Sequence, residues 1–575
     1  MGWFRWQRRD ARGVLALSLA AILVACASSA GAPSTTGQNP SAQSPEPQRT
    51  LVIGSWGEPA GLASVPVRDS GNSVRAATRL FNAELQLQDA VGNAHPYLAE
   101  ANPRLNTDTW QVFPDGRMET RYQLRPNLTW HDGTPLAAED FVFAWQVYST
   151  PEFATTSISI KQMEEVLAPD NRTVVIRWRS SYPEADALFE TFQALPRHIL
   201  GQYLRDGDHD GLVNHAYWTV EYVGLGPFKL VRWEPGSFIE GAAFDGHALG
   251  KPKSARVLIK LIAEESAIFT NVLAGEIHFA PKGLRFEDGK NLKRDWSSNQ
   301  RGLVVFIPIQ PRFIQVQLRP EVAQPRAMLD VRTRRAFAHA IDKKSLNETL
   351  FDGEPAGADT FLYRGVPDYA EIERSVTRYP YDLRQTEQLM AEVGYVKGSD
   401  GFYTSEAGER FSTEFWGDVG PQFELDHGAV SGGWRQAGLE TRATYVAPAQ
   451  LRDGQFRSSF KGMYFTATGT GTAPSLVLAS TAAIPTVANR YNGSNRGGWS
   501  SPEFERLWEM HNTTLDRSER TRALAEIERL ISTDLPFLMV FHNFHVVAYS
   551  ANLKGPDTRG ERDLMYWNVH EWELM

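Results

Sequence analysis

The chain has 575 residues, more than one hydrophobic core usually holds, so two or three domains are expected. An apolar fraction of 42% and a charged fraction of 22% are ordinary for globular proteins and argue against disorder. The formal net charge of -9 is not concentrated in runs, and no basic patch could follow a phosphate backbone. Nucleic acid is therefore not expected as a partner.

The first residues have the pattern of a signal peptide. The apolar run Gly13–Val24 follows a basic segment, Arg5–Arg12, and is shorter than the ~20 residues that a membrane-spanning helix needs. It ends in Leu23–Cys26, which looks like a lipobox. Cys26 is the only cysteine, so it cannot form an internal disulfide. We expect lipidation at Cys26; the alternative is an ordinary secretory signal with a chance cysteine.

A low-complexity stretch follows the cysteine. Residues Ala27–Arg49 have almost no large apolar side chain and cannot offset their ordering entropy by burial, which predicts a flexible tether. The expected division is a signal peptide at 1–25 and a lipidated tether at 26–50. No later stretch has 18 consecutive apolar residues. The pattern predicts an extracytoplasmic protein, lipid-anchored to a bacterial membrane.

Strands and helices alternate without a repeat in the first half of the body. Short β-prone runs predict strands at Leu51–Gly54, Met118–Leu124, Val174–Trp178 and Val257–Ile262. An Asp-Gly pair predicts a turn at His131–Thr134, and a helix should begin near Pro135 with Phe141, Trp145 and Tyr148 on one face. Another helix should pass through Ile268, Val272 and Leu273 and stop at Gly275.

The second half has clear capping signals. Asp330 can cap a helix that runs to Ile341, and Asp382 with Gln385 forms a possible capping box before a helix ended by Gly394. Ser501 precedes a proline at the first helical position, and Asp516 precedes a helix with Leu524, Ile527 and Ile531 inward. The run Leu538–Ala548 is typical of a strand. These elements predict an α/β protein with more than one lobe.

Several segments, taken in order, resemble the bacterial extracellular solute-binding proteins of family 5, the peptide, nickel and oligosaccharide type. The likeness rests on Leu124–Leu136 (LRPNLTWHDGTPL), Ala138–Phe141 (AEDF), Gly224–Leu230 (GLGPFKL), Arg334–Asp342 (RRAFAHAID), Tyr381–Asp382 with Gly394–Tyr395, and Asp516–Arg520 with Asp534–Pro536. Each motif alone is weak, but their order behind a lipobox is specific, and together they span Leu51 to Leu553.

The resemblance implies a two-lobed α/β fold of the periplasmic-binding-protein type II kind, with an extra subdomain and a hinged cleft. It places lobe I with the extra subdomain at 51–308, lobe II at 309–536 and a return to lobe I at 537–575. It implies a monomeric substrate-binding component of an ABC importer, without cofactor or catalytic residues. The component would capture a small solute, foremost an oligopeptide, and deliver it to a membrane permease with its ATPase subunits.

The same resemblance suggests ligand contacts. Those expected from lobe I are Trp56 and Glu58, and those from lobe II are Trp416, Asp418, Phe465, Thr466, Asn489, Arg490 and Tyr491. With 16 tryptophans in the chain, most must belong to the core. Each acidic residue also has the simpler interpretation of a solvated loop charge.

Two departures from the family pattern matter. Ala137 stands where members often have a serine or threonine helix cap, a difference of ~1 kcal/mol. The stretch Met463–Pro474 has no acidic residue, whereas many peptide-binding members carry there an aspartate for the peptide's amino terminus. A buried ammonium without a partner costs several kcal/mol, so Asp418 or Glu58 would have to replace that aspartate.

Other functions stay open. An oligosaccharide-binding importer subunit is favoured weakly by an aromatic content of 11% and by the missing acidic residue. A secreted hydrolase would need an acid–base pair such as Asp132 and Asp140, yet a tight turn and a helix start explain both. A metal is not expected at His542 and His545, because a three-residue gap in a strand places the two rings on opposite faces. A receptor role would use the same cleft.

Overall fold

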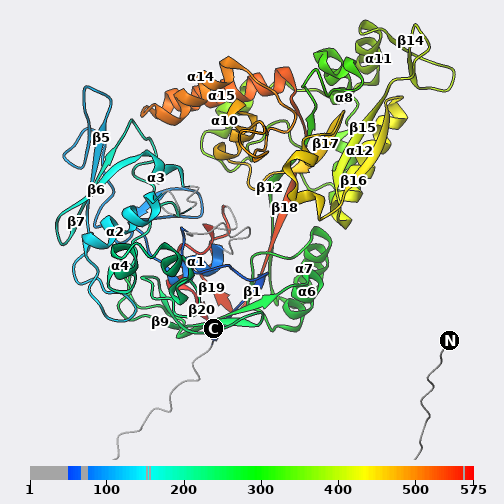
Figure 1. Ribbon diagram of the computed structural model, residues 1–575. Coiled ribbons are helices and arrows are strands. Elements are labelled where there is room, and N and C mark those ends of the chain that lie inside the picture. Colours follow the sequence, from blue (N-terminus) through cyan, green and yellow to red (C-terminus); the bar gives the residue numbers. More distant parts are fainter. Residues whose placement is uncertain (1–49, 66–74, 151–152, 154–156, 189, 561–563) are drawn as a thin grey trace, which may run out of the picture. The chain divides into compact units, whose positions relative to one another are not determined.

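The computed structural model describes residues 50–65, 75–150, 153, 157–188, 190–560 and 564–575 (Figure 1). The expected signal peptide, Cys26 and nearly all of the expected tether lie outside the described residues. Residues Gln48–Met575 form one compact unit. Within the described part of that unit, no helix combines the length and the apolar composition that crossing a bilayer requires.

A ten-stranded mixed sheet organises the body. Its order is β16-β15-β17-β12-β18-β11-β1-β10-β9-β8. The strands are β1 (Thr50–Trp56), β8 (Phe228–Glu234), β9 (Phe238–Ala243), β10 (Arg256–Ile262), β11 (Phe279–Ala280), β12 (Gly302–Val316), β15 (Ser412–Asp418), β16 (Glu440–Val446), β17 (Met463–Ala467) and β18 (Phe537–Ser550). β1 is parallel to β10 and β11, and β15 is parallel to β16 and β17.

Smaller sheets complete the β-structure. A four-stranded antiparallel sheet has the order β4-β5-β7-β6. Its strands are β4 (Trp110–Val112), β5 (Met118–Gln123), β6 (Met163–Asp170) and β7 (Thr173–Trp178). Three two-stranded pairs are β2 (Gln86–Gln88) with β3 (Ala94–Pro96), β13 (Tyr395–Lys397) with β14 (Tyr403–Ser405), and β19 (Leu553–Lys554) with β20 (Glu573–Leu574).

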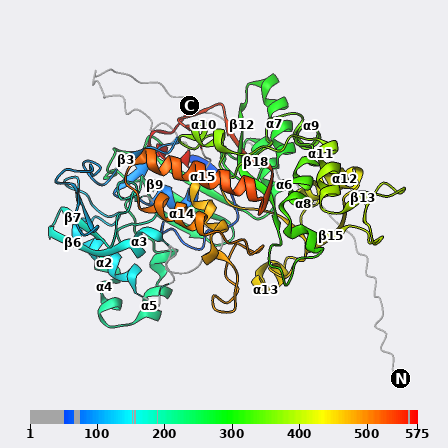
Figure 2. The same cartoon turned by 90° about the horizontal axis from the view of Figure 1, so that it is seen from above.

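Helices cover the sheets. Those in the first half are α1 (Arg75–Phe81), α2 (Ala138–Ser149), α3 (Ile158–Gln162), α4 (Arg197–Arg205), α5 (His209–Asn214), α6 (Glu265–Ala274) and α7 (Phe286–Asn299). Those in the second half are α8 (Val331–His339), α9 (Lys343–Phe351), α10 (Tyr369–Ile372), α11 (Leu383–Glu392), α12 (Pro421–Ala437), α13 (Gly454–Arg457), α14 (Pro502–Thr513) and α15 (Arg517–Asp534). Helix α12 packs on β15 and β16, α7 on β12 and β18, and α14 beside α15 (Figure 2). The predicted mixed α/β class is confirmed.

The predicted caps explain where several helices begin. The side chains of Asp330, Ser501 and Asp516 each accept a hydrogen bond from a backbone N–H in the first turn of α8, α14 and α15. Asp382 caps α11 through the N–H groups of residues 384 and 385, but its own N–H bonds to the carbonyl of His339, so the predicted capping box is only half formed. These polar groups satisfy donors that the helix itself leaves unpaired.

Two helix bounds differ from the prediction. Helix α8 ends at His339 rather than Ile341, because Ala340 leaves the helical conformation. Helix α2 begins at Ala138, three residues after the predicted start near Pro135. Ala137 has no cap side chain, as its sequence predicts, and its N–H donates instead to the carboxylate of Asp140 at 3.0 Å.

Two of the motifs that carry the family resemblance, Leu124–Leu136 and Gly224–Leu230, contact each other. This contact explains structurally why both motifs are present. The turn predicted at His131–Thr134 is present, with Gly133 at φ 90°. The His131 ring accepts a hydrogen bond from Gly224 N at 3.1 Å through Nδ1 and donates to Gly226 O at 3.0 Å through Nε2. Burial lowers the pKa of His131 to about 4, so the neutral ring can hold both bonds. The imidazole therefore joins the two motif loops.

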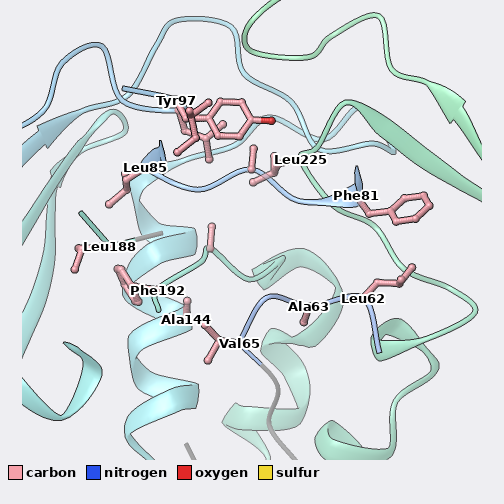
Figure 3. Close-up of a cluster of buried hydrophobic side chains, with 14 of the residues drawn as sticks. Leu62, Ala63, Val65, Phe81, Leu85, Tyr97, Ala144, Leu188, Phe192 and Leu225 are labelled. Carbon is pink, nitrogen blue, oxygen red and sulfur yellow. The ribbon is translucent and has the colours of Figure 1, made fainter. Parts of the chain in front are cut away.

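Hydrophobic clusters fill the space between the layers. The largest contains side chains from residues 51–309 together with others from 547–572. Figure 3 shows part of it, with Leu62, Phe81, Ala144, Phe192 and Leu225 gathered from segments far apart in the sequence. A second cluster joins residues 268–304 to the α8, α12 and β17 region, and a third lies beneath α14 and α15.

Strands β12 and β18 pair along most of their length at the centre of the sheet (Figure 1). Their antiparallel register shifts twice, between Pro308 and Gln310 and between Arg312 and Phe313 of β12. Each shift interrupts the ladder of hydrogen bonds and lets the strands bend. β17 pairs with β12 only from Arg312 onward, so the irregular stretch lies where one half of the sheet gives way to the other.

Candidate functional site

The carboxyl ends of the parallel strands define two candidate ligand sites, the first at the end of β1 and the second at the ends of β15 and β17. In open α/β sheets, ligands bind beyond the carboxyl ends of strands, because loops and helix N-termini meet there. Here β1 ends at Trp56, and β15 ends at Asp418 beside the end of β17. In the sheet order these two places lie on opposite sides of the β12–β18 pair. Residues predicted from the sequence occupy both.

Asp418 lies at the centre of the second candidate site, at the carboxyl ends of β15 and β17. Its side chain is almost buried, with 8% exposure. One carboxylate oxygen accepts a hydrogen bond from the hydroxyl of Tyr464, and the other accepts from Thr466 Oγ1 at 3.2 Å. Since β15 and β17 are neighbours in register, alternate residues of both strands reach the same face. The structure therefore brings the predicted residues Asp418 and Thr466 into contact.

Trp416 lies on the same face but in an apolar setting. It packs against Phe456, Phe460 and Tyr464, and its Nε1 donates to Glu414 at 3.2 Å. Its exposure is 8%. In this arrangement Trp416 supports Tyr464 and leaves little surface of its own to a ligand.

Phe465 lies on the opposite face of the sheet. It is fully buried, with ring contacts to Phe415 and to His427 of α12. The alternation of side chains along β17 requires this, because Tyr464 and Thr466 point to the Asp418 side. Phe465 has no solvent-facing surface in this structure, and a ligand role for it stays a prediction.

The predicted loop Asn489–Tyr491 is a compact turn. Asn489 accepts a hydrogen bond from Thr486 N at 2.8 Å and donates to Ile484 O at 2.8 Å. Arg490 and Tyr491 have positive φ values of 54° and 57°. The Tyr491 carbonyl approaches Gly454, where a Cβ would lie 2.3 Å from its oxygen. This contact places the loop against the start of α13.

Trp56 and Glu58 belong to the first candidate site, at the carboxyl end of β1. Trp56 is 36% exposed, its Nε1 donates to Ala263 O at 3.1 Å, and Lys282 Nζ lies 5.1 Å from its ring centroid. The exposed Glu58 accepts hydrogen bonds from Trp233 Nε1 at 2.7 Å and from Gly236 N at 3.0 Å. Trp56 thus offers an aromatic surface, whereas Glu58 holds the turn between β8 and β9.

Sequence reasoning missed the arginines around Asp418. Arg457 of α13 donates from Nε to Tyr464 OH at 3.2 Å. Arg496 interacts electrostatically with Asp418, Tyr464 and Arg457, and burial lowers its pKa to about 10. Arg496 follows the predicted loop by only five residues, so extending that loop would have found it. Arg457 has no sequence signal, because its proximity depends on the fold.

A buried ion pair lies on the other face of the same sheet edge. Arg312 of β12 is 3% exposed, and its Nε is 3.7 Å from Asp426 Oδ2 of α12. The guanidinium also lies 3.8 Å from the centroid of the Phe423 ring. Burial raises the pKa of Asp426 to about 6, although Arg312 opposes that rise. The pair links α12 to the part of β12 where pairing with β17 begins.

The described residues contain no group of three or more His, Cys, Asp or Glu side chains arranged to hold a metal ion. His542 is buried, and its Nε2 contacts the Phe361 carbonyl at 3.2 Å. A cavity beneath α15 is lined by Lys343, Asp359 and Glu528 among others, and none of the predicted ligand residues reaches it.

Comparison with known proteins identifies the family. The sequence model of "Bacterial extracellular solute-binding proteins, family 5 Middle" matches residues 100–484. The chain belongs to this family. The resemblance seen in the motifs is thereby confirmed, and members are extracellular proteins that bind solutes.

The following relatives have low sequence identity, but each aligns with nearly the whole length of this chain. The oligopeptide-binding protein AppA of Bacillus subtilis is 22% identical over 573 residues, 97% of each chain. NikZ of Campylobacter jejuni, solved with Ni(L-His), has a TM-score of 0.71 at 22% identity, covering 92% of this chain and 100% of its own. An oligopeptide-binding protein of Thermus thermophilus, solved with a pentapeptide, has a TM-score of 0.70 at 22% identity, covering 91% and 96%. The solved structures establish a shared fold.

Proposed function

We propose that this family 5 protein is the substrate-binding component of an ABC importer and that its ligand is an oligopeptide. The strongest sequence support is the likeness to AppA, an oligopeptide-binding protein, over almost the entire chain. The supporting structural observation is the sheet order, in which two sets of parallel strands end on either side of β12 and β18. Carboxyl ends of parallel strands are where open α/β sheets bind ligands.

The mechanism is closure about the β12–β18 pair. Lobe I would comprise 51–308 and 537–575, and lobe II 309–536, so that both crossings between lobes fall in β12 and near the start of β18. A ligand favours the closed state only if it contacts both lobes. Trp56 in lobe I, and Asp418 with its partners Tyr464 and Thr466 in lobe II, would supply such contacts. A permease would then recognise the closed form.

The location follows from the N-terminal pattern. Lipidation at Cys26 would hold the protein at a bacterial membrane as a monomer, since two or more acyl chains, each CH₂ contributing ~0.8 kcal/mol, bind a bilayer firmly. The stretch 27–49 would let the body reach its permease.

A thermal-shift screen tests the proposal. Purified protein without its first 26 residues is heated with di- to hexapeptides and, in parallel, with oligosaccharides of similar size. We expect peptides to raise the melting temperature, because a ligand that binds only the folded state stabilises it. Native mass spectrometry of the protein as purified should show a retained peptide. A rise with oligosaccharides alone would reject peptide binding.

A further inference from the structure

The cavity beneath α15 lies apart from both candidate ligand sites. Its walls come from α8, α9, α15, residues 377–379 and the first residues of β18. The cavity has a volume of about 20 Å³. A cavity needs roughly 10–15 Å³ to hold one water molecule, so this one has room for a guest of that size.

A buried carboxyl group, that of Glu528 in α15, lines the cavity. Glu528 is 1% exposed, and its Oε1 has no hydrogen-bond partner among the described residues. Burial raises the pKa of Glu528 to about 7, while hydrogen bonds from the Thr360 side chain and from the backbone of Phe361 and Leu362 oppose that rise. Buried polar atoms in proteins are nearly always hydrogen-bonded, either to protein or to ordered water. Glu528 Oε1 therefore needs a donor from within the cavity.

Other polar side chains that line the cavity are already engaged. Lys343 Nζ donates to Ala358 O at 2.6 Å and to Asp359 Oδ1 at 2.5 Å. Ser532 Oγ accepts from Thr377 N at 2.9 Å and donates to a carbonyl one turn earlier in α15. None of these groups donates to Glu528 Oε1.

The charges along the walls favour a neutral guest. The ammonium group of Lys343 disfavours a cation, and the carboxyl groups of Asp359 and Glu528 disfavour an anion. An apolar guest would leave the buried Oε1 without a hydrogen bond, which is unfavourable. A water molecule is small, neutral and a donor. Buried waters typically bond to about three polar groups that the protein leaves unpaired.

We propose that the cavity beneath α15 binds an ordered water molecule that donates a hydrogen bond to Glu528 Oε1. The water keeps a second hydrogen and two lone pairs for other groups of the wall, and Lys343 Nζ has a third hydrogen to donate. This site is independent of the proposed import function, because none of the residues expected to bind the solute lines the cavity.

The site supports an irregular part of the central sheet. Glu528 interacts with the stretch 360–362, and two residues earlier Ala358 N donates to Val540 O at 3.3 Å. Val540 is the residue of β18 that the second register shift leaves without a partner on β12. A carboxyl group that bonds to both the bound water and the stretch 360–362 would hold this stretch against the bend in β18.

A crystal structure of the wild-type protein tests the water directly. We expect density for one water molecule about 2.5–3.0 Å from Glu528 Oε1. Crystals under xenon should show no xenon in the cavity, because xenon enters dry, apolar cavities. Crystals soaked in rubidium chloride should show no anomalous peak there. An empty cavity, bound xenon or a rubidium peak would overturn the proposal.

A variant assigns the water to the carboxyl group. Glu528→Leu removes the acceptor at similar side-chain volume, so the water should be absent from its crystals. Hydrogen exchange of the amides in 356–363 should become about tenfold faster, because this stretch loses a partner. Glu526→Leu changes an exposed glutamate of the same helix and should leave the water and the exchange rates unchanged.

Two results with Glu528→Leu would reject the role of Glu528. One is water at the same position, and the other is unchanged exchange in 356–363. If Glu528→Leu does not fold, the density in the wild-type crystal still decides whether the water is bound.

Discussion

At the scale of single residues, Glu84 shows how burial makes this fold sensitive to pH. Glu84 is 6% exposed and accepts a hydrogen bond from the backbone N–H of Glu190. Burial, aided by the nearby charge of Glu190, raises the pKa of Glu84 to about 8 from its ordinary value of 4.5. The folded protein therefore keeps a proton there that the unfolded chain releases.

The sign of the effect follows from this linkage. The contribution of Glu84 to stability is fully present below the unfolded pKa of 4.5 and is lost as the pH rises through about 8. Glu84→Gln cannot titrate, so the wild type should lose up to about 1.4 kcal/mol of unfolding free energy per pH unit relative to the variant in that window. Urea unfolding at several pH values between 5 and 8 measures it.

A second carboxyl serves as the control for Glu84. Glu406 is exposed in the loop after β14, and Glu406→Gln should leave the pH profile of stability unchanged. Parallel profiles for wild type and Glu84→Gln would show that the native state does not hold this proton.

At the scale of elements, helix α12 carries glycines that the fold does not require. Gly428, Gly432 and Gly433 have nothing within 4 Å of an added Cβ. Glycine in a helix costs roughly 0.5–1 kcal/mol relative to alanine because of its larger backbone entropy in the unfolded chain. Gly432→Ala should therefore raise the free energy of unfolding by that amount, as measured by urea denaturation.

Gly226 is the matched opposite within the same chain. A Cβ there would lie 2.4 Å from Asn82 N and 2.4 Å from the Phe81 carbonyl carbon. Gly226→Ala should therefore destabilise the protein by about 1–3 kcal/mol, since backbone must move. If both alanine variants shifted stability in the same direction, the packing of the Gly224–Leu230 loop against Phe81 would be in doubt.

Local signals predicted only part of this fold, chiefly the helices with a clear cap. Caps such as Asp516 and Ser501 act within one turn, so the sequence alone located the starts of α14 and α15. The half-formed box at Asp382 depended on a contact with His339, which lies far away in the sequence. A helix cap can therefore be predicted from the sequence only when the groups that it bonds to are near it in the chain.

The candidate site could be predicted only in part. The family resemblance suggested both Phe465 and Thr466 as ligand contacts, but these are neighbours on one strand and cannot both face the same side of the sheet. The pairing of β17 with β15 and β12 decides which one meets Asp418. Arg457 joins the group through the path of the chain in three dimensions, which no spacing in the sequence records.

At the scale of the whole molecule, two features bear on closure. The register shifts at Pro308–Gln310 and Arg312–Phe313 weaken the ladder between β12 and β18 where both expected lobes meet. Far along the chain, Arg520 of α15 pairs with Glu184, at 2.7 Å between Nη1 and Oε1. If 51–308 and 309–536 move about β12 and β18, this exposed pair joins the two moving parts.

X-ray scattering with and without a bound peptide tests that movement. We expect the radius of gyration to fall on binding, because a ligand that contacts both lobes favours the closed state. Glu184→Lys should place two cations together and reduce ligand affinity modestly, by less than about tenfold, since an exposed ion pair contributes ~0–1 kcal/mol. Adding Arg520→Glu should restore the attraction and the affinity. An unchanged radius with saturating ligand would mean that the body binds its solute as one rigid unit.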